Sequence, residues 1–171
     1  MSADPALRIL QPGMTVGILG GGQLGRMLAV AAAELGLETH IYCPDARSPA
    51  FAVAAARTVA SYGDEESLAA FAAAVDVVTY EFENVPAETT DFLSTRVPVL
   101  PGPQALAVAQ DRLAEKELMV ELGIPVPVFA PVASQADLYS GLARTGRPAI
   151  LKTRRMGYDG KGQVTIRPGD D

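Results

Sequence analysis

The stretch TVGILGGGQLGRMLA, residues 15–29, decides the fold of the first part of the chain. It begins with an apolar run of strand length, which is typical of a parallel strand covered on both faces. Gly20, Gly22 and Gly25 follow with the spacing Gly-x-Gly-x-x-Gly, and a helix rich in Leu, Met and Ala is expected over 23–35. Such glycines allow a tight turn, and the helix amides after it can face an anion. The stretch therefore predicts a strand, a turn and a helix, with a ligand at the turn.

The glycine spacing alone leaves the identity of that ligand open. A dinucleotide site also needs an acidic residue near the end of the second strand, where it binds the ribose. Asp45 lies close to that position, behind Pro44. A bound dinucleotide, a different ligand and a turn that serves only packing are all compatible with the motif.

The alternation of strands and helices continues to Gly102. We expect further strands in ETHIYC (38–43), RTVAS (57–61), DVVTYE (76–81) and VPVLPG (97–102), and helices in SPAFAVAA (48–55), DEESLAAFAAA (64–74) and PAETTDFLS (86–94). This order predicts an α/β fold in which residues 1–102 form a doubly wound parallel sheet.

The pattern changes at Pro103, where a second module is expected over 103–171. It begins with one long charged helix over 103–123 and has a further helix near 135–144. The strands PAILKT (148–153) and QVTIR (163–167) then flank a glycine-rich loop, RRMGYDGKGQ. Two strands with few partners make an incomplete sheet, so we expect the chain to be a fragment of a longer protein.

Acidic and amide side chains follow the predicted strand DVVTYE. Glu81, Glu83 and Asn84 lie at its carboxyl end, where ligands bind beside open parallel sheets. These groups can accept hydrogen bonds from sugar hydroxyls or an amine. The alternative is a solvated junction in which Asn84 caps the next helix.

The glycine-rich loop has the composition of a phosphate site. Lys152 ends an apolar strand and can offer a positive point charge. Gly157, Gly160 and Gly162 allow successive backbone amides to face one anion. The loop is not a P-loop, because no Gly-Lys-Ser or Gly-Lys-Thr occurs. The alternative is a mobile hairpin with a basic face; the cations that favour phosphate are Lys152, Arg154, Arg155, Lys161 and Arg167.

The stretch AQDRLAEKELM carries alternating charges at helical spacing. Arg112 and Lys116 lie one turn apart, as do Asp111 and Glu115. This pattern is typical of a solvated helix face, and it gains a role only beside a phosphate loop.

Composition excludes several classes of function. The 171 residues carry a net charge of −6 without a basic block, so we expect no nucleic-acid partner. The single cysteine, Cys43, and the single histidine, His40, give no zinc-binding set, and both are expected to be structural. The sequence has no recognisable signal peptide or membrane-spanning run, so we expect no membrane partner and a cytoplasmic location.

Taken in order, four motifs resemble those of the ATP-grasp ligases, most closely the 5-(carboxyamino)imidazole ribonucleotide synthase family. The motifs are GGGQLGRM (20–27), YEFENVP (80–86), AQDRLAEK (109–116) and GYDGKGQ (157–163). The resemblance implies a Rossmann-like pre-ATP-grasp domain followed by the start of an ATP-grasp domain. It also implies a homodimeric ligase that carboxylates 5-aminoimidazole ribonucleotide with ATP, bicarbonate and Mg²⁺, by way of carboxyphosphate.

The resemblance also implies roles for individual residues. Gly22, Gln23, Leu24 and Glu81 would contact the aminoimidazole ribonucleotide. The implied ATP contacts are Arg112, Lys152, Gly157, Tyr158, Asp159, Gly160, Lys161, Gly162 and Gln163. The catalytic residues and the Mg²⁺ ligands would lie in a continuation beyond this sequence, so we expect the fragment alone to be inactive.

Other hypotheses for the function stay open. Formate-dependent glycinamide ribonucleotide transformylase would carry Glu in place of Gln23 and a serine-rich loop before Gly160; biotin carboxylase shares the architecture but fits these motifs less well. An NAD(P)-dependent oxidoreductase would explain the glycine turn but not the basic loop. A non-catalytic nucleotide-binding module is the remaining alternative.

Overall fold

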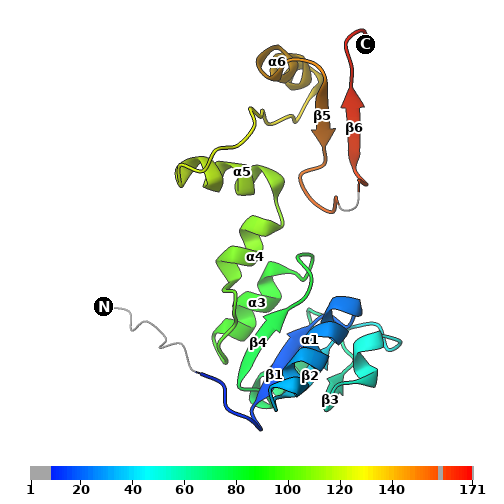
Figure 1. Ribbon diagram of the computed structural model, residues 1–171, viewed down its shortest axis with the longest axis vertical. Helices are drawn as coiled ribbons and strands as arrows, with labels where there is room; N and C mark the ends of the chain where they lie inside the picture. Colours follow the sequence, from blue (N-terminus) through cyan, green and yellow to red (C-terminus); the bar gives the residue numbers. More distant parts are fainter. Residues whose placement is uncertain (1–8, 158–159, 171) are drawn as a thin grey trace. The chain divides into compact units, whose positions relative to one another are not determined.

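The structure is a computed structural model that describes residues 9–157 and 160–170 (Figure 1). It divides into two compact units, the first running to Leu106 and the second beginning at Ala107. The domain boundary expected between residues 102 and 103 stays a prediction. None of the helices in the described residues is both long enough and apolar enough to cross a membrane.

The first unit is built on a parallel sheet, as the sequence predicts, and this sheet has four of the five expected strands. Its strand order is β3-β2-β1-β4, so the chain turns back to the other side of β1 when it forms β4. The strands are β1 (Thr15–Leu19), β2 (Glu38–Tyr42), β3 (Ala56–Thr58) and β4 (Val77–Tyr80). In open α/β sheets the ligand crevice lies at such a reversal, outside the carboxyl ends of the strands. The segments that follow β1 and β4 are therefore the place to look for a ligand.

Both faces of this sheet are covered. Ile18 and Ile41 pack in one buried cluster with Ala29 of α1, while their neighbours Leu19 and Tyr42 belong to a second cluster. Successive side chains of a strand point to opposite faces, which explains this division. The second cluster contains residues of α2 and α3. The helices are α1 (Gln23–Glu34), the 3₁₀ helix Pro49–Ala52, α2 (Glu65–Ala73) and α3 (Ala87–Ser94). The prediction of a doubly wound sheet is confirmed.

The prediction of a strand in residues 97–102 is wrong. Within the described residues this segment forms only an isolated parallel bridge, between Val99 and Val78. The Val78 amide donates to the Pro98 carbonyl at 2.8 Å, and the Leu100 amide donates to the Val78 carbonyl at 2.9 Å. Pro98 and Pro101 have no amide hydrogen to donate, so the pairing cannot extend into a ladder.

The prediction of one long helix over 103–123 is also wrong, because the helix is interrupted at Gln110 and Asp111. The structure has α4 (Pro103–Ala109), which spans the division between the units, and α5 (Arg112–Glu121). Asp111 leaves the helical conformation, with φ −126° and ψ 109°, and its carboxylate accepts hydrogen bonds from the first amides of α5. An aspartate that caps a helix in this way starts a new one instead of continuing the old.

The second unit contains α5, α6 (Gln135–Thr145) and a two-stranded sheet. The strands β5 (Ala149–Lys152) and β6 (Gln163–Ile166) are antiparallel, with Lys152 opposite Gln163. None of the described hydrophobic side chains from residue 107 onward is fully buried. Since this unit lacks a deep apolar core in its described part, polar contacts carry much of its local order.

Candidate functional site

A carboxylate of the same chain is hydrogen-bonded to the glycine turn of the first unit. Glu81 follows β4, next to β1 in the sheet. Its Oε1 accepts a hydrogen bond from the Gly22 amide at 2.8 Å, and its Oε2 accepts one from the Gly25 amide at 3.0 Å. The carboxylate therefore occupies amides at the N-terminus of α1, where the helix dipole favours a negative charge.

This internal carboxylate explains the glycine spacing. A Cβ at Gly22 would lie 2.8 Å from Glu81 Oε1, and one at Gly25 would lie 2.7 Å from the Gly20 carbonyl oxygen. Gly20 itself has φ +106° and is also in contact with Glu81. All three glycines are therefore required by packing within the chain, whether or not a ligand is bound.

The geometry argues against a dinucleotide at this turn. A pyrophosphate would need the amides that Glu81 already holds, and it would meet the negative charge of Glu81 at hydrogen-bond distance. Asp45, the candidate ribose ligand, accepts a hydrogen bond from the Arg47 amide at 2.9 Å, and its side chain is 61% exposed. The sequence features that favoured a dinucleotide have explanations within the chain itself.

The predicted ribonucleotide-binding residues lie together at this end of the sheet. Gly22 precedes α1, Gln23 and Leu24 form its first turn, and Glu81 contacts Gly22 directly. Gln23 is exposed, and Leu24 is 57% exposed. The alternative role for Asn84 is wrong, because Pro86 takes the N-cap position of α3.

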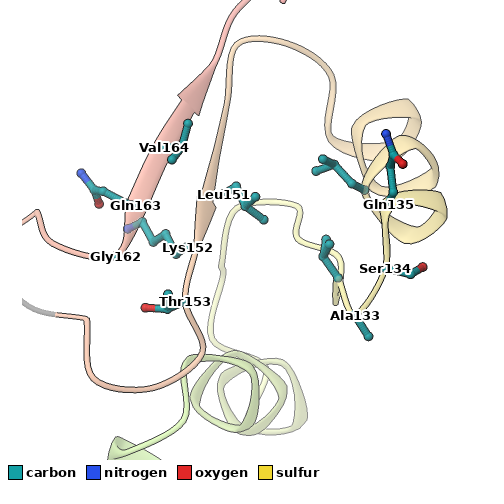
Figure 2. Close-up of a pocket in the computed structure, with 11 residues that line it drawn as sticks. Ala133, Ser134, Gln135, Leu151, Lys152, Thr153, Gly162, Gln163 and Val164 are labelled. Carbon is teal, nitrogen blue, oxygen red and sulfur yellow. The ribbon is translucent and has the colours of Figure 1, made fainter. Parts of the chain in front are cut away.

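A second candidate site lies in the second unit, beside the β5–β6 hairpin. An open groove there is lined by the end of β5, the start of β6 and the first turn of α6 (Figure 2). Lys152 and Gln163, which lie opposite each other on the two strands, are among its lining residues, at the end where the glycine-rich loop connects the strands. The lining residues are Val132, Ala133, Ser134, Gln135, Leu138, Leu151, Lys152, Thr153, Gly162, Gln163 and Val164.

Thr153 organises the base of the glycine-rich loop, a role that sequence analysis missed. Its amide donates to the Gly162 carbonyl at 2.8 Å. A Cβ at Gly157 would lie 2.9 Å from Thr153 Oγ1, and one at Gly162, where φ is +68°, would lie 2.5 Å from it. The two glycines let both ends of the loop close around this side chain. Thr153 is an ordinary strand residue in the sequence, so no local signal marks it.

Asp111 binds the start of the same loop. Its Oδ1 and Oδ2 accept hydrogen bonds from Arg154 Nε at 3.0 Å and Arg154 Nη2 at 2.7 Å, and Arg155 Nε lies 3.5 Å from Oδ2. The Arg154 hydrogen bonds, followed by those from the Leu113 and Ala114 amides, lower the pKa of Asp111 to about 2. Two of the five cations expected to favour phosphate therefore face a carboxylate of the chain.

Arg112 also contacts the loop. Its Nη2 donates to the Gly157 carbonyl at 2.6 Å, and its amide donates to the Arg154 carbonyl at 2.9 Å. The structure thus brings Arg112, Lys152, Gly157 and the segment 160–163 into one region of the second unit. Tyr158 and Asp159, also predicted as ATP contacts, lie outside the described residues.

The described residues contain no group of three or more His, Cys, Asp or Glu side chains placed to hold a metal ion.

Comparison with known families assigns both parts of the chain. Residues 13–110 match the ribonucleotide synthetase preATP-grasp domain, and residues 117–171 match the ATP-grasp domain. The N5-carboxyaminoimidazole ribonucleotide synthase of Brucella melitensis is 51% identical over 95% of this chain and 45% of its own length.

Two solved structures are similar in fold and in sequence. The ADP complex of PurK, an N5-carboxyaminoimidazole ribonucleotide synthetase, has a TM-score of 0.89 at 42% identity and covers 94% of this chain and 43% of that one. The Aspergillus clavatus N5-carboxyaminoimidazole synthase, complexed with ADP and 5-aminoimidazole ribonucleotide, has a TM-score of 0.81 at 28% identity and covers 92% of this chain and 42% of that one. The chain spans less than half the length of each of these relatives.

The resemblance carried by the four motifs is confirmed by these matches, as are the parallel-sheet fold and the start of an ATP-grasp domain. The preATP-grasp match alone covers more than half of the 171 residues. We conclude that the chain belongs to the ribonucleotide synthetase preATP-grasp family.

Proposed function

We propose that the protein carrying this chain carboxylates 5-aminoimidazole ribonucleotide to 5-(carboxyamino)imidazole ribonucleotide, using ATP and bicarbonate, in purine synthesis. The observation that carries the proposal is the 51% identity over 95% of this chain to an N5-carboxyaminoimidazole ribonucleotide synthase. The Aspergillus clavatus relative, solved with ADP and 5-aminoimidazole ribonucleotide, supports both ligands.

In this proposal the ATP phosphates bind at the β5–β6 hairpin. Lys152 supplies a positive charge at the rim of the groove, and the glycine-rich loop supplies backbone amides. Arg112, Gly157, Gly160, Lys161, Gly162 and Gln163 complete the described part of the proposed contact set, and Tyr158 and Asp159 belong to the same proposal. Phosphoryl transfer depends on positioning and on neutralising phosphate charge, which these groups are suited to do.

The aminoimidazole ribonucleotide binds at the glycine turn of the first unit. Glu81 keeps lone pairs on both carboxylate oxygens and can accept a hydrogen bond from a hydroxyl or an amine. Gln23, exposed in the first turn of α1, can both donate and accept, and Leu24 offers an apolar surface to a ring. Because Glu81 is negative, this turn favours hydroxyls and amines over phosphate.

Mg²⁺, bicarbonate, a homodimeric assembly and a cytoplasmic location are parts of the same proposal. The metal would neutralise ATP phosphate charge and would require oxygen ligands. Because the described residues do not form such a ligand group, we assign none of them to the metal and derive no step through it.

The test is ADP release by the complete protein that contains this chain, with ATP, Mg²⁺ and bicarbonate, with and without 5-aminoimidazole ribonucleotide. We expect release that depends on the ribonucleotide and falls at least tenfold in Lys152→Ala, because a phosphate-facing charge is worth several kcal/mol in a transition state. Glu88→Gln, in the first turn of α3, is the matched control and should retain activity. Release with glycinamide ribonucleotide and formate in its place would contradict the substrate assignment.

The 171 residues by themselves should show no turnover. They span less than half the length of the relatives, and the proposal places the catalytic residues and metal ligands in the remainder. ADP release by the purified 171-residue chain, at a rate above that of a Lys152→Ala preparation, would contradict this expectation.

A further inference from the structure

Asp111 is the only buried aspartate or glutamate among the described residues, at 5% exposed. A buried carboxylate is costly unless it is hydrogen-bonded and paired. Its position, between α4 and α5, is the point where the expected long helix is interrupted. The burial, the pairing and the helix break therefore all occur at one residue.

The Asp111 carboxylate makes two separate sets of contacts, one to α5 and one to the glycine-rich loop. Toward α5 it is a helix cap, accepting from the Leu113 amide at 2.9 Å and the Ala114 amide at 3.4 Å. Toward the glycine-rich loop it forms a bidentate ion pair with Arg154, and two parallel hydrogen bonds of this kind fix the orientation of a guanidinium. One carboxylate thus connects the start of a helix to the first residue of the loop.

The backbone next to Asp111 repeats the connection. The Arg112 amide donates to the Arg154 carbonyl, and Arg112 Nη2 donates to the Gly157 carbonyl. Residues 111 and 112 therefore hold both Arg154 and Gly157. In an uninterrupted helix the Arg112 amide would bond within the helix, so the break at Asp111 leaves this amide free to donate to the Arg154 carbonyl.

We propose that Asp111, through Arg154, is a positioning residue that holds the first turn of the glycine-rich loop on the N-terminus of α5, so that Lys152 and the loop amides are set for phosphate. The loop geometry stands on the contacts above; only the identity of the ligand rests on the proposed function. Arg154 then serves structure and does not contact phosphate. A measurement of the loop without ligand therefore tests the contacts of Asp111, and a measurement of nucleotide binding tests the proposed function. Either can give a negative result without the other.

The two roles of Asp111 can be separated by substitution. Asp111→Asn keeps a good helix cap but removes the charge that pairs with Arg154. Arg154→Gln removes the other half of the pair and leaves the cap intact. Asp64→Asn is the matched control, because Asp64 caps α2 by accepting from the Ser67 amide at 3.0 Å, in the other unit.

The experiment is cleavage of the 171-residue chain by an endoprotease that cuts only after lysine, with fragments identified by mass. Lys161 reports opening of the loop, and Lys116, within α5, reports loss of the helix. Cleavage in the native state follows the population of the open form when reclosing is fast. Far-ultraviolet circular dichroism establishes that each variant keeps its helices.

We expect Asp111→Asn and Arg154→Gln each to speed cleavage at Lys161 by about 5-fold, a modest factor because Arg154 is partly solvent-screened. The double variant should be no faster than either single one, because both act through the same pair. Arg154→Gln should leave cleavage at Lys116 unchanged, and Asp64→Asn should change neither site.

Unchanged cleavage at Lys161 in either single variant would overturn the proposal, as would additive effects in the double variant. Faster cleavage only at Lys116 in Asp111→Asn would show a cap and nothing more, which also overturns it. Isothermal titration with ATP on the same samples should show a Kd raised by a similar factor. If wild type shows no ATP binding while Lys161 cleavage follows the expected pattern, the positioning role stands and the proposed nucleotide site fails.

Discussion

Each unit of the molecule places a carboxylate beside a glycine-rich segment, but the two carboxylates bind different groups. Glu81 accepts hydrogen bonds from the amides of the glycine turn itself, at Gly22 and Gly25. Asp111 accepts from Arg154 and from the amides that begin α5, and no described hydrogen bond joins it to a glycine amide of the loop. The amides of the glycine turn are therefore already bonded to a carboxylate of the chain. The glycine-rich loop is instead held through the side chain of its first residue, Arg154.

The comparison shows that a glycine pattern does not by itself specify a phosphate site. Glycines give the backbone its freedom, but the charge that faces the amides selects the ligand. At the turn of the first unit that charge is the negative Glu81, whereas the residue at the end of β5, beside the glycine-rich loop, is the positive Lys152. The same physical rule thus predicts a ribonucleotide's hydroxyls or amine at one segment and phosphates at the other.

The substitution with the greatest predicted consequence is in the glycine turn of the first unit. Gly25→Val places a Cβ 2.7 Å from the Gly20 carbonyl oxygen, and this backbone atom cannot rotate away. We expect the free energy of unfolding to fall by about 2–4 kcal/mol. Urea denaturation measures the change. Ala31→Val, at an exposed position of the same helix, is the control for valine in a helix; an equal loss in both variants would contradict the packing explanation.

The next effect removes the charge that distinguishes the two segments. Glu81→Gln keeps the side-chain shape but weakens its hold on the amides of Gly22 and Gly25, so we expect a loss of about 1–2 kcal/mol. The turn should then accept an external anion. Sulfate should raise the melting temperature of Glu81→Gln more than that of wild type or of Glu83→Gln. Equal sulfate effects in all three proteins would show that Glu81 does not close the turn to anions.

A smaller effect is the pH dependence of the contacts of Asp111 beside the glycine-rich loop. The pKa of Asp111 is lowered from 3.8 to about 2, chiefly by its hydrogen bonds with Arg154. A lowered carboxyl pKa stabilises the folded state fully above pH 4, and this stabilisation is lost as the pH falls toward 2. The nuclear magnetic resonance signal of the Leu113 amide, which bonds to this carboxylate, should not titrate between pH 7 and pH 4. A titration midpoint near 4 would contradict the pairing.

The smallest effect concerns the residue that favoured a dinucleotide. Asp45 is exposed, and its side chain makes only local contacts among those described: a hydrogen bond from the Arg47 amide and an ion pair with the Arg47 guanidinium. Asp45→Asn should therefore leave both the urea midpoint and the response to NAD unchanged, as exposed charges contribute little. Fluorescence titration with NADH checks the second point. Binding by wild type that is lost in Asp45→Asn would restore the dinucleotide interpretation.

Much of the first unit can be predicted from sequence because its signals are local. Short runs dominated by apolar and β-branched residues mark β1 and β4, and the glycines mark the turn after β1. The error in residues 97–102 has a local cause as well: the apolar pattern predicts a strand, but Pro98 and Pro101 cannot donate to a ladder.

The features that decide the sites are not local, and the sequence does not reveal them. Glu81 lies 59 positions from Gly22, and Arg154 lies 43 positions from Asp111. In the sequence Asp111 resembles one more charge on a solvated helix, because helical spacing says nothing of a partner on a distant loop. Thr153 is likewise an ordinary strand residue until the loop closes around it.

The most direct test of the central claim is a titration of the isotopically labelled chain with ATP, followed by the backbone amide signals in nuclear magnetic resonance spectra. We expect the largest shifts in residues 152–157 and 160–163, and we expect Lys152→Ala to weaken them. Residues 20–25, where the amides of Gly22 and Gly25 bond to Glu81, should stay nearly unchanged. Shifts concentrated in residues 20–25, with the loop unaffected, would contradict the claim that the charge facing each glycine segment selects its ligand.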